Sequence, residues 1–279
     1  MSNHSRRRKK KKIGRILLVL LCAALACVFA YSAYQVYETV FAPGGYYQSN
    51  KNAQQVQQSY VTISTPASPT PTPQGTVEAE QEEEIILDPE VSPVTVDFDA
   101  LSSRNSEIIA WLYCPNTVIN YPVVQTDDNM YYLHKDIDGN YSSYGTLFVD
   151  CLLEKGFKST NNVIYGHHMN DGKMFAKLVD YAYQSYYDEH PVMYLNTPDI
   201  NYRVELFAGY VTSMDSDTYT FSFSDAAENQ AWLDSVIAQS KFQSNVDVKA
   251  GDKILTLSTC TYDYDDARFV VLGKLVPIH

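Results

Sequence analysis

Hydrophobic residues form one long run near the start of the chain and many short runs in its second half. The long run, Ile16–Ala33, has no charge and no helix breaker, and about 20 such residues span a bilayer as a helix. Tyr31, Tyr34 and Tyr37 lie at its end, and tyrosines are typical of a membrane–water interface. A cleaved signal peptide would have a shorter apolar region, of roughly 7–15 residues, before a small-residue cleavage site. The pattern therefore predicts an uncleaved transmembrane anchor over residues 16–37.

The short runs alternate with polar turns, as in proteins built mainly of β-strands. Strands are predicted at residues 118–124, 145–150, 162–165, 192–195, 202–211, 254–257 and 269–275. The pair 192–195 and 202–211 suits a hairpin. Helices are predicted at Asp97–Leu112, Met174–Tyr181 and Asp225–Phe242. Many short strands with few helices favour a mainly β fold, a closed barrel with helical additions.

Two local signals refine these assignments. Asp225 and Glu228 give the last helix a start resembling a capping box, and its Trp232, Val236 and Ile237 are expected to face inward. Pro122 has no amide donor, so it is expected at an edge or a bulge of its strand.

A polar stretch separates the anchor from the predicted barrel. Residues 38–93 contain Gln-rich, Ser/Thr/Pro-rich and acidic runs with little periodicity. Such a composition buries too little apolar surface to fold, so it predicts a flexible extracellular linker. The expected organisation is a cytoplasmic basic tail over 1–15, the anchor, the linker over 38–93, and a folded domain over 94–279.

Charge is distributed unevenly along the 279 residues. The net charge is −12, yet residues 1–15 carry eight Lys and Arg and no acidic residue. The remainder has 13 basic and 33 acidic residues, a net charge of −20. Phosphate binding requires a positive face, so the folded domain is not expected to bind nucleic acid. A cationic flank stays in the cytoplasm, which predicts an extracellular domain on a single-pass membrane protein.

Candidate chemistry lies at the ends of predicted strands. Cys260 ends one strand, Arg268 begins the next, and His167 and His168 follow the strand at 162–165. A lone cysteine is most often a small buried residue. A thiol beside an imidazole, however, becomes a nucleophile at neutral pH, and an arginine can stabilise an oxyanion. The histidine-bearing turn shifts the balance towards nucleophilic chemistry.

These residues stand in motifs that resemble a known family. Thr256–Cys260 resembles the T-L-x-T-C signature of sortases, Tyr165–Met169 resembles their catalytic histidine segment, and Arg268 falls where their essential arginine falls. Further segments resemble class B sortases in order and spacing: Val96–Leu101, Ile109–Tyr113, Ile119–Gln125, Asn129–Leu133 and Asp171–Leu178. The resemblance extends from about residue 94 to the C-terminus.

The resemblance implies a fold, a set of roles and a reaction. It implies a closed sortase-type barrel of about eight strands, with N-terminal helices and an inserted helix before the cysteine strand. It makes Cys260 the nucleophile, His167 the acid and base, and Arg268 the electrostatic stabiliser. Ser258 and Thr259 would bind substrate. It implies no metal and no organic cofactor.

Three other groups of residues allow alternative interpretations. Cys114 and Cys151 are either buried thiols, which the sequence favours, or a disulfide. A zinc site at His167, His168 and Cys260 lacks the usual paired ligand spacing. The turn with Asp263, Asp265 and Asp266 lacks a calcium-loop pattern and is expected to be a solvated acidic turn that partners Arg268.

The expected function is cysteine transpeptidation at a Gram-positive cell surface. The enzyme would cleave secreted proteins after the Thr of a C-terminal sorting motif, similar to N-P-x-T-x, through a thioacyl intermediate. A peptidoglycan precursor amine would then receive the acyl group. Two alternatives remain open from the sequence. One is a sortase that joins pilin subunits through a lysine amine, and the other is a non-catalytic surface binding protein.

Overall fold

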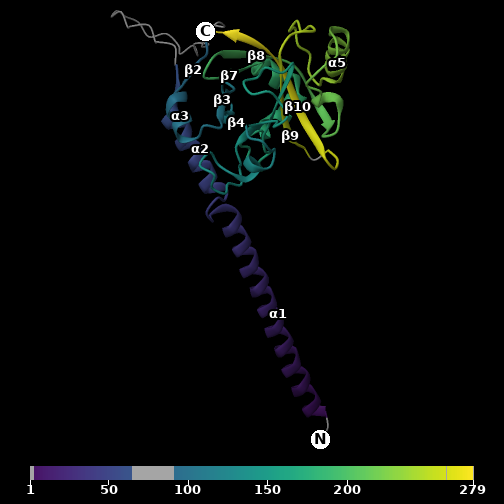
Figure 1. The fold of residues 1–279 in the computed structure, drawn as a ribbon. Coiled ribbons are helices and arrows are strands. Elements are labelled where there is room, and N and C mark those ends of the chain that lie inside the picture. Colours follow the sequence, from purple (N-terminus) through teal and green to yellow (C-terminus); the bar gives the residue numbers. More distant parts are fainter. Residues whose placement is uncertain (1–2, 65–90, 262, 279) are drawn as a thin grey trace, which may run out of the picture.

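The computed structural model describes residues 3–64, 91–261 and 263–278. Its first element is a long helix, α1 (Asn3–Val40), which extends away from the rest of the molecule (Figure 1). Within the described residues, Arg15–Val40 is the one helical stretch long and apolar enough to cross a membrane, judged by length and composition. Its side chains from Arg15 to Thr39 are exposed. The stretch agrees with the predicted anchor in position.

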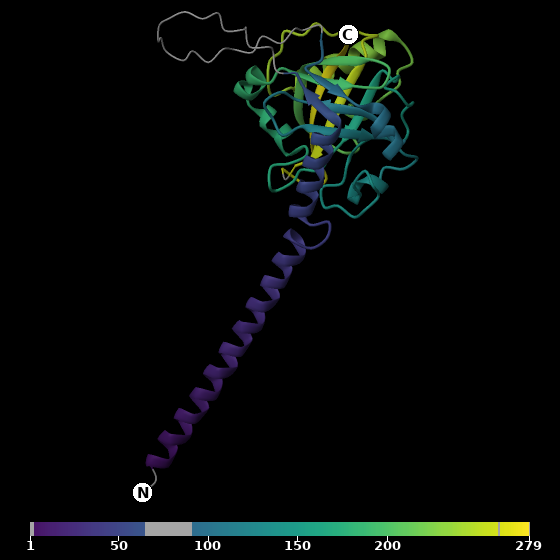
Figure 2. The ribbon, with the colours of Figure 1, turned by 90° about the vertical axis from the view of Figure 1, so that its left-hand side faces the viewer.

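Eight strands close into a barrel, which confirms the predicted mainly β fold (Figure 2). The strands are β3 (Ile108–Tyr113), β4 (Asn120–Val124), β5 (Leu147–Val149), β6 (Asn161–Tyr165), β7 (Val192–Asn196), β8 (Asn201–Ser213), β9 (Ile254–Cys260) and β10 (Ala267–Ile278). Around the barrel they follow the order β10-β8-β7-β3-β4-β5-β6-β9. The β4–β5 and β6–β9 pairs are parallel and the other pairs are antiparallel. The predicted hairpin is formed by β7 and β8.

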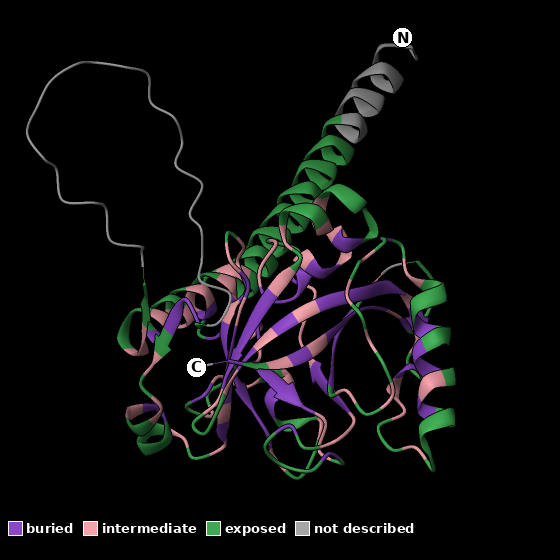
Figure 3. Cartoon of the chain, turned by 90° about the horizontal axis from the view of Figure 1, so that it is seen from above, coloured by how far each residue is buried: buried purple, intermediate pink, exposed green. Residues whose placement is uncertain are grey.

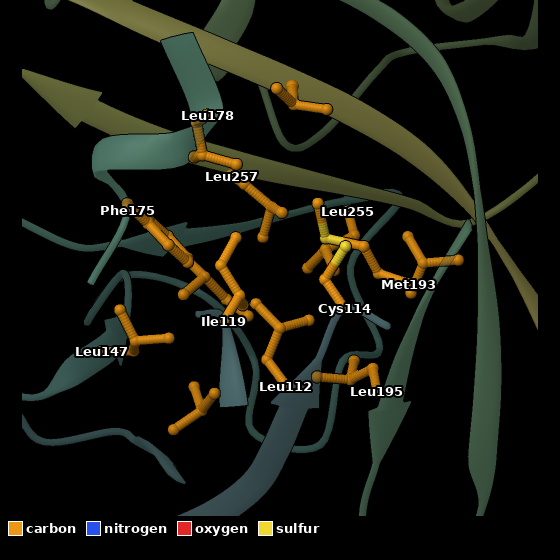
Figure 4. Close-up of a cluster of buried hydrophobic side chains, with 14 of the residues drawn as sticks. Leu112, Cys114, Ile119, Leu147, Phe175, Leu178, Met193, Leu195, Leu255 and Leu257 are labelled. Carbon is orange, nitrogen blue, oxygen red and sulfur yellow. The ribbon is translucent and has the colours of Figure 1, made fainter. Parts of the chain in front are cut away.

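The barrel interior is filled by apolar side chains from nearly every strand. Figure 4 shows Leu112, Ile119, Leu147, Leu195 and Leu257 converging from different strands and loops. Alternate strand residues point to the same side, so the inward-facing positions form one continuous core. The barrel is therefore a packed body that can hold residues at the strand ends rigidly.

The outer face of β8, β9 and β10 is covered by helix α5 (Ala226–Gln239), the helix expected before the cysteine strand. The Asp225 side chain caps it by accepting a hydrogen bond from the Glu228 amide at 2.8 Å. Trp232 and Val236 are buried as predicted. The prediction for Ile237 is wrong, because this side chain is 42% exposed. The apolar stripe of α5 is therefore narrower than its sequence indicates. Figure 3 shows that the strands of the barrel are largely buried.

This difference gives a matched stability test on one helix. Leu233 is 0% exposed, whereas Ile237 is 42% exposed. We expect Leu233→Ala to lower the free energy of unfolding by about 2–5 kcal/mol, because it removes buried methyl groups and leaves a cavity. We expect Ile237→Ala to lower it by at most about 1 kcal/mol. Denaturant unfolding measures both variants, and equal losses would contradict the assigned helix face.

The helix predicted at Asp97–Leu112 is wrong beyond its first half. A short helix, α3 (Phe98–Arg104), ends at Asn105, and the chain then enters β3. The Asn105 side chain donates hydrogen bonds to the Tyr132 hydroxyl at 2.6 Å and the Ile137 carbonyl at 2.8 Å. Pairing of β3 with both β4 and β7 outweighs the apparent helical period of the sequence.

The linker predicted at residues 38–93 is also wrong over its first part. Helix α2 (Tyr46–Tyr60) lies against the barrel, and strand β1 (Val61–Ile63) pairs with β2 (Val94–Val96). Val56 of α2 is 6% exposed, and the Gln57 side chain donates to the Asn120 carbonyl at 2.6 Å. The apolar residues on the buried face of α2 are few and are separated by glutamines. The sequence therefore shows no clear helical period there. Residues 65–90 of the predicted linker lie outside the described residues.

Pro122 occupies the kind of position its missing amide requires. β4 pairs with β5 only at Val123 and Val124, so Pro122 lies just before that pairing begins. On its other side Pro122 faces Trp111 of β3. A proline at this point removes no hydrogen bond from the β4–β5 pair.

Candidate active site

Sheet register brings the ends of β6, β9 and β10 together. β6 and β9 are parallel, with Tyr165 opposite Ser258. His167 and Cys260 each follow two residues later, so both lie at the same end of the barrel. β9 and β10 are antiparallel, and Arg268 lies directly opposite Cys260. Residues far apart in the sequence are thus placed side by side by strand pairing alone.

A cleft of about 380 Å³ opens at this end of the barrel. All five predicted site residues line it: His167, Ser258, Thr259, Cys260 and Arg268. Seven further residues complete the lining: Asn129, Leu133, Phe148, Tyr165, Gly166, Met214 and Tyr219. The size falls within the range of pockets that bind small ligands or a few residues of peptide.

Cys260 is the exposed end of an otherwise buried strand. Two hydroxyls fasten the strand just before it. Thr259 donates to the Gly166 carbonyl at 2.8 Å, and Ser258 shares a hydrogen bond with the Tyr219 hydroxyl at 2.9 Å. The sulfur is therefore carried on a rigid backbone and opens into the cleft, as a nucleophile requires.

The other two thiols of the barrel are unsuited to nucleophilic attack. Cys114 is 0% exposed, and burial raises its pKa to about 11. It lies among the core side chains in Figure 4. Burial, together with the nearby Asp150 carboxylate, raises the pKa of Cys151. Both are free thiols, so the disulfide alternative does not hold.

His167 is held in one orientation by its surroundings. Its Nε2 lies 2.6 Å from the Leu133 carbonyl, which can only accept, so Nε2 carries the proton. Nδ1 is then the nitrogen that can accept a proton. Gly166 precedes it where a Cβ would overlap the side chains of Leu147 and Phe175, so only glycine lets the chain pass this close to the core.

The pKa of His167 lies below its ordinary value of 6.5, first because burial disfavours the charged form and also because His134 lies nearby. The folded chain therefore binds this proton at a lower pH than the unfolded chain does. Its contribution to stability is fully present above about pH 6.5 and is lost as the pH falls through the folded-state pKa.

This sign gives a pH-dependent prediction. We expect His167→Gln to flatten the loss of unfolding free energy between about pH 7 and about pH 5, because the variant has no imidazole to charge. Urea unfolding of the detergent-solubilised chain at several pH values measures the slope. His190→Gln is the control, and a His167→Gln slope equal to that of the unsubstituted chain would refute the assigned direction.

Arg268 keeps its guanidinium available to the cleft. Its Nη1 donates to the neighbouring Ala267 carbonyl at 3.0 Å. Across residues 3–64, 91–261 and 263–278, no carboxylate forms an ion pair with it, so the expectation that the acidic turn partners Arg268 is wrong. Asp263 of that turn instead accepts a hydrogen bond from Thr261 at 2.6 Å. The acidic side chains are solvated, which leaves the cation for a ligand.

Several further residues lie at or beside the site without a role assigned from the sequence. His168 donates from Nδ1 to the Cys260 carbonyl at 3.1 Å. Tyr219 and Met214 come from the segment after β8, and no motif marked them. Asn129, Leu133 and Tyr165 lay within segments that carried the resemblance but had no assigned role. No group of three metal-ligating side chains occurs among the described residues.

Comparisons with known proteins agree with this arrangement. A family model described as the sortase domain matches residues 112–276. Sortase B of Listeria monocytogenes is 38% identical over 178 residues, covering 63% of this chain and 72% of that protein.

Solved structures give the same result. A Bacillus anthracis protein similar to sortase B has a TM-score of 0.66 at 31% identity, covering 84% of this chain and 98% of that one. The Staphylococcus aureus sortase B–substrate complex has a TM-score of 0.62 at 32% identity, covering 65% of this chain and 85% of that one. The fold, the family model and these relatives agree: the chain belongs to the sortase family, in its class B branch, and is a cysteine transpeptidase.

Proposed function

We propose that Cys260, His167 and Arg268 carry out the transpeptidation, acting on the C-terminal sorting signal of secreted proteins. The observation that carries this proposal is the shared cleft, which all three side chains line from the ends of β6, β9 and β10. The exposed sulfur of Cys260 is the nucleophile. Nδ1 of His167 is the site of proton exchange, and the Arg268 guanidinium supplies positive charge.

The first half-reaction forms a thioester. The Cys260 sulfur attacks the carbonyl carbon of a Thr in the signal, and its proton passes to His167. Arg268 stabilises the oxyanion of the tetrahedral intermediate. The C–N bond after the Thr then breaks, and His167 gives the proton to the departing amine. The low pKa of His167 favours this release, because the imidazolium is a strong enough acid to protonate the amine.

The second half-reaction transfers the acyl group. An acceptor amine attacks the thioester carbon, and His167 takes a proton from it. The C–S bond breaks, the thiol of Cys260 is restored, and a new amide joins the protein to the acceptor. No metal or organic cofactor enters either step.

The expected signal is similar to N-P-x-T-x, and the expected acceptor is a peptidoglycan precursor amine. Membership of the class B branch supports a sorting signal as substrate, and a solved sortase B complexed with triglycine, a peptide with a free amine, supports an amine acceptor. Ser258 and Thr259 line the cleft beside Cys260 and would bind the peptide backbone. Their hydroxyls already bond to Tyr219 and Gly166, so they would act together with those partners.

The proposed location is the outer face of a Gram-positive cell membrane. α1 would cross the bilayer once, with the basic residues of 1–15 in the cytoplasm and the barrel outside. This orientation places the cleft on the side of the membrane where secreted proteins and wall precursors meet.

Mass spectrometry of the detergent-solubilised full-length chain tests the proposal. Incubation with a panel of sorting peptides should give an adduct on Cys260 whose mass matches the peptide cleaved after Thr. Added triglycine should discharge it to a new amide, whereas a pilin-type lysine donor should not. Failure of every peptide to form an adduct would refute the substrate class, and transfer to the lysine donor alone would favour pilus assembly.

A further inference from the structure

A short 3₁₀ helix, η1 (Tyr131–His134), makes two separate contacts with His167. The Leu133 carbonyl accepts the hydrogen bond from Nε2, and the His134 ring stacks on the His167 ring with centroids 5.4 Å apart and planes 22° apart. We propose that His134 is a positioning residue, whose stacked ring holds the His167 imidazole in the plane that presents Nδ1 for proton exchange. The proposal deepens the proposed function and rests on it, since it takes His167 as the acid and base.

A third ring lies close to His134. Tyr141 lies with its ring centroid 6.3 Å from that of His134, and Lys135 forms a backbone bridge with Tyr141. Neighbouring aromatic rings at such spacing attract one another. Tyr141, His134 and His167 thus form a row of rings that ends in the cleft.

The row begins at the joint between α1 and α2. Gly44 of this joint has a φ of +80°, and a Cβ there would overlap the Tyr141 backbone and ring. The Gly44 carbonyl also accepts a hydrogen bond from the Ser143 amide at 2.9 Å. The joint therefore fastens the loop that supports His134. Figure 1 shows α2 beside the barrel at the point where α1 leaves it.

Close packing and hydrogen bonds also hold the backbone of η1 in place. Gly145 has a φ of +60°, and a Cβ there would lie 2.5 Å from the Leu133 oxygen that accepts the hydrogen bond of His167. The Tyr132 carbonyl accepts from the Thr146 amide at 3.0 Å, and the Tyr132 hydroxyl donates to Glu107 at 2.6 Å. A fixed carbonyl sets the tautomer of His167, but one hydrogen bond leaves the ring free to rotate about it. The stacked His134 ring removes that freedom.

The other titratable groups around His167 come from different elements. Tyr165 of β6, Tyr219 after β8, Cys260 of β9 and Arg268 of β10 line the same cleft. Tyr141 lies beyond His134. Burial lowers the pKa of His167, and electrostatic interaction with His134 lowers it further. Stacking and charge are separable by substitution, because phenylalanine keeps a ring but carries no charge.

The test compares His134→Ala with His134→Phe in the full-length chain. We expect His134→Ala to lower kcat for acylation about threefold to tenfold, the loss expected for one aromatic pair of ordinary strength. We expect His134→Phe to stay within about twofold of the unsubstituted chain, because the ring is restored. In both variants the NMR titration midpoint of the His167 ring should rise, together with the acid limb of the pH–rate profile.

His190→Ala is the control, since His190 packs against Tyr186 away from the cleft. It should change neither the His167 titration nor the pH–rate profile. Equal rate losses for His134→Ala and His134→Phe would overturn the positioning role. A His167 midpoint that moves in neither variant would overturn the electrostatic contact between the two rings. The NMR titration of His167 does not depend on turnover, so it tests the contact between the two rings even if the proposed function is wrong. Retained acylation in His167→Ala would refute the proposed function alone.

Discussion

Replacing Cys260 with alanine is expected to abolish acyl-enzyme formation and to lower transfer by at least about 10⁴-fold, as loss of a catalytic nucleophile does elsewhere. The reason is geometric. Cys260 is the thiol that lines the cleft with His167 and Arg268, and alanine has no atom able to form the thioester. The fold should be unaffected, because the Cys260 side chain is exposed at the end of β9. Intact-mass spectrometry and thermal unfolding of the same sample measure both outcomes.

Two other cysteines of the barrel supply matched controls. Cys151→Ala should keep full transfer, because this thiol does not line the cleft. Cys114→Ala should also keep transfer, while losing some stability through the space left in the packed core. An acyl adduct on Cys151, or transfer retained by Cys260→Ala, would show that the nucleophile is misassigned.

The barrel could be predicted from the sequence because its strands carry strong local signals. Short β-branched runs bounded by polar turns marked β6, β8, β9 and β10, whose inward positions must be apolar in any closed barrel. β3 was mistaken for the end of a helix, because Ile108, Ile109 and Leu112 fit a helical period as well as a strand. What decides between the two is pairing with β4, the next strand along the chain, and with β7, which is distant in the sequence.

Helix α2 shows a different limit. Val56 is buried against the barrel, yet it stands between glutamines and gives no amphipathic pattern. Its stability comes from tertiary contacts such as the Gln57 hydrogen bond to the Asn120 carbonyl. Local composition therefore predicts a flexible linker where the folded chain forms a packed helix.

The site was predicted where its residues stand in motifs and missed where they do not. Cys260, His167 and Arg268 follow from strand ends and from resemblance, and strand register then explains why they share one cleft. Tyr219 reaches the site from a loop, and only the folded chain reveals its bond to Ser258. The stacking of His134 on His167 is likewise visible only in the folded chain, because no sequence motif links the two residues.

Replacing Arg268 with alanine is expected to lower kcat/KM by about 10²–10³-fold, the usual loss when a donor to an oxyanion is removed. Arg268 lies opposite Cys260, and its guanidinium has no carboxylate partner among the described residues, so its charge is available to a developing oxyanion. The Arg268 charge also affects a neighbouring group of the cleft, Tyr219. Burial raises the pKa of Tyr219, and the Arg268 guanidinium partly offsets that rise.

Arg268→Lys separates charge from geometry, because lysine keeps the positive charge but not the planar pair of donors. We expect kcat/KM of Arg268→Lys to exceed that of Arg268→Ala by less than about tenfold. A bidentate donor fixes the position of the oxyanion as well as attracting it. Arg104→Ala is the control. Arg104 pairs with Asp138 at 2.6 Å, outside the cleft, so its loss should cost at most about 1 kcal/mol of stability and leave kcat/KM unchanged. Equal activity of Arg268→Ala and the unsubstituted chain would mean that the oxyanion is stabilised by backbone amides alone.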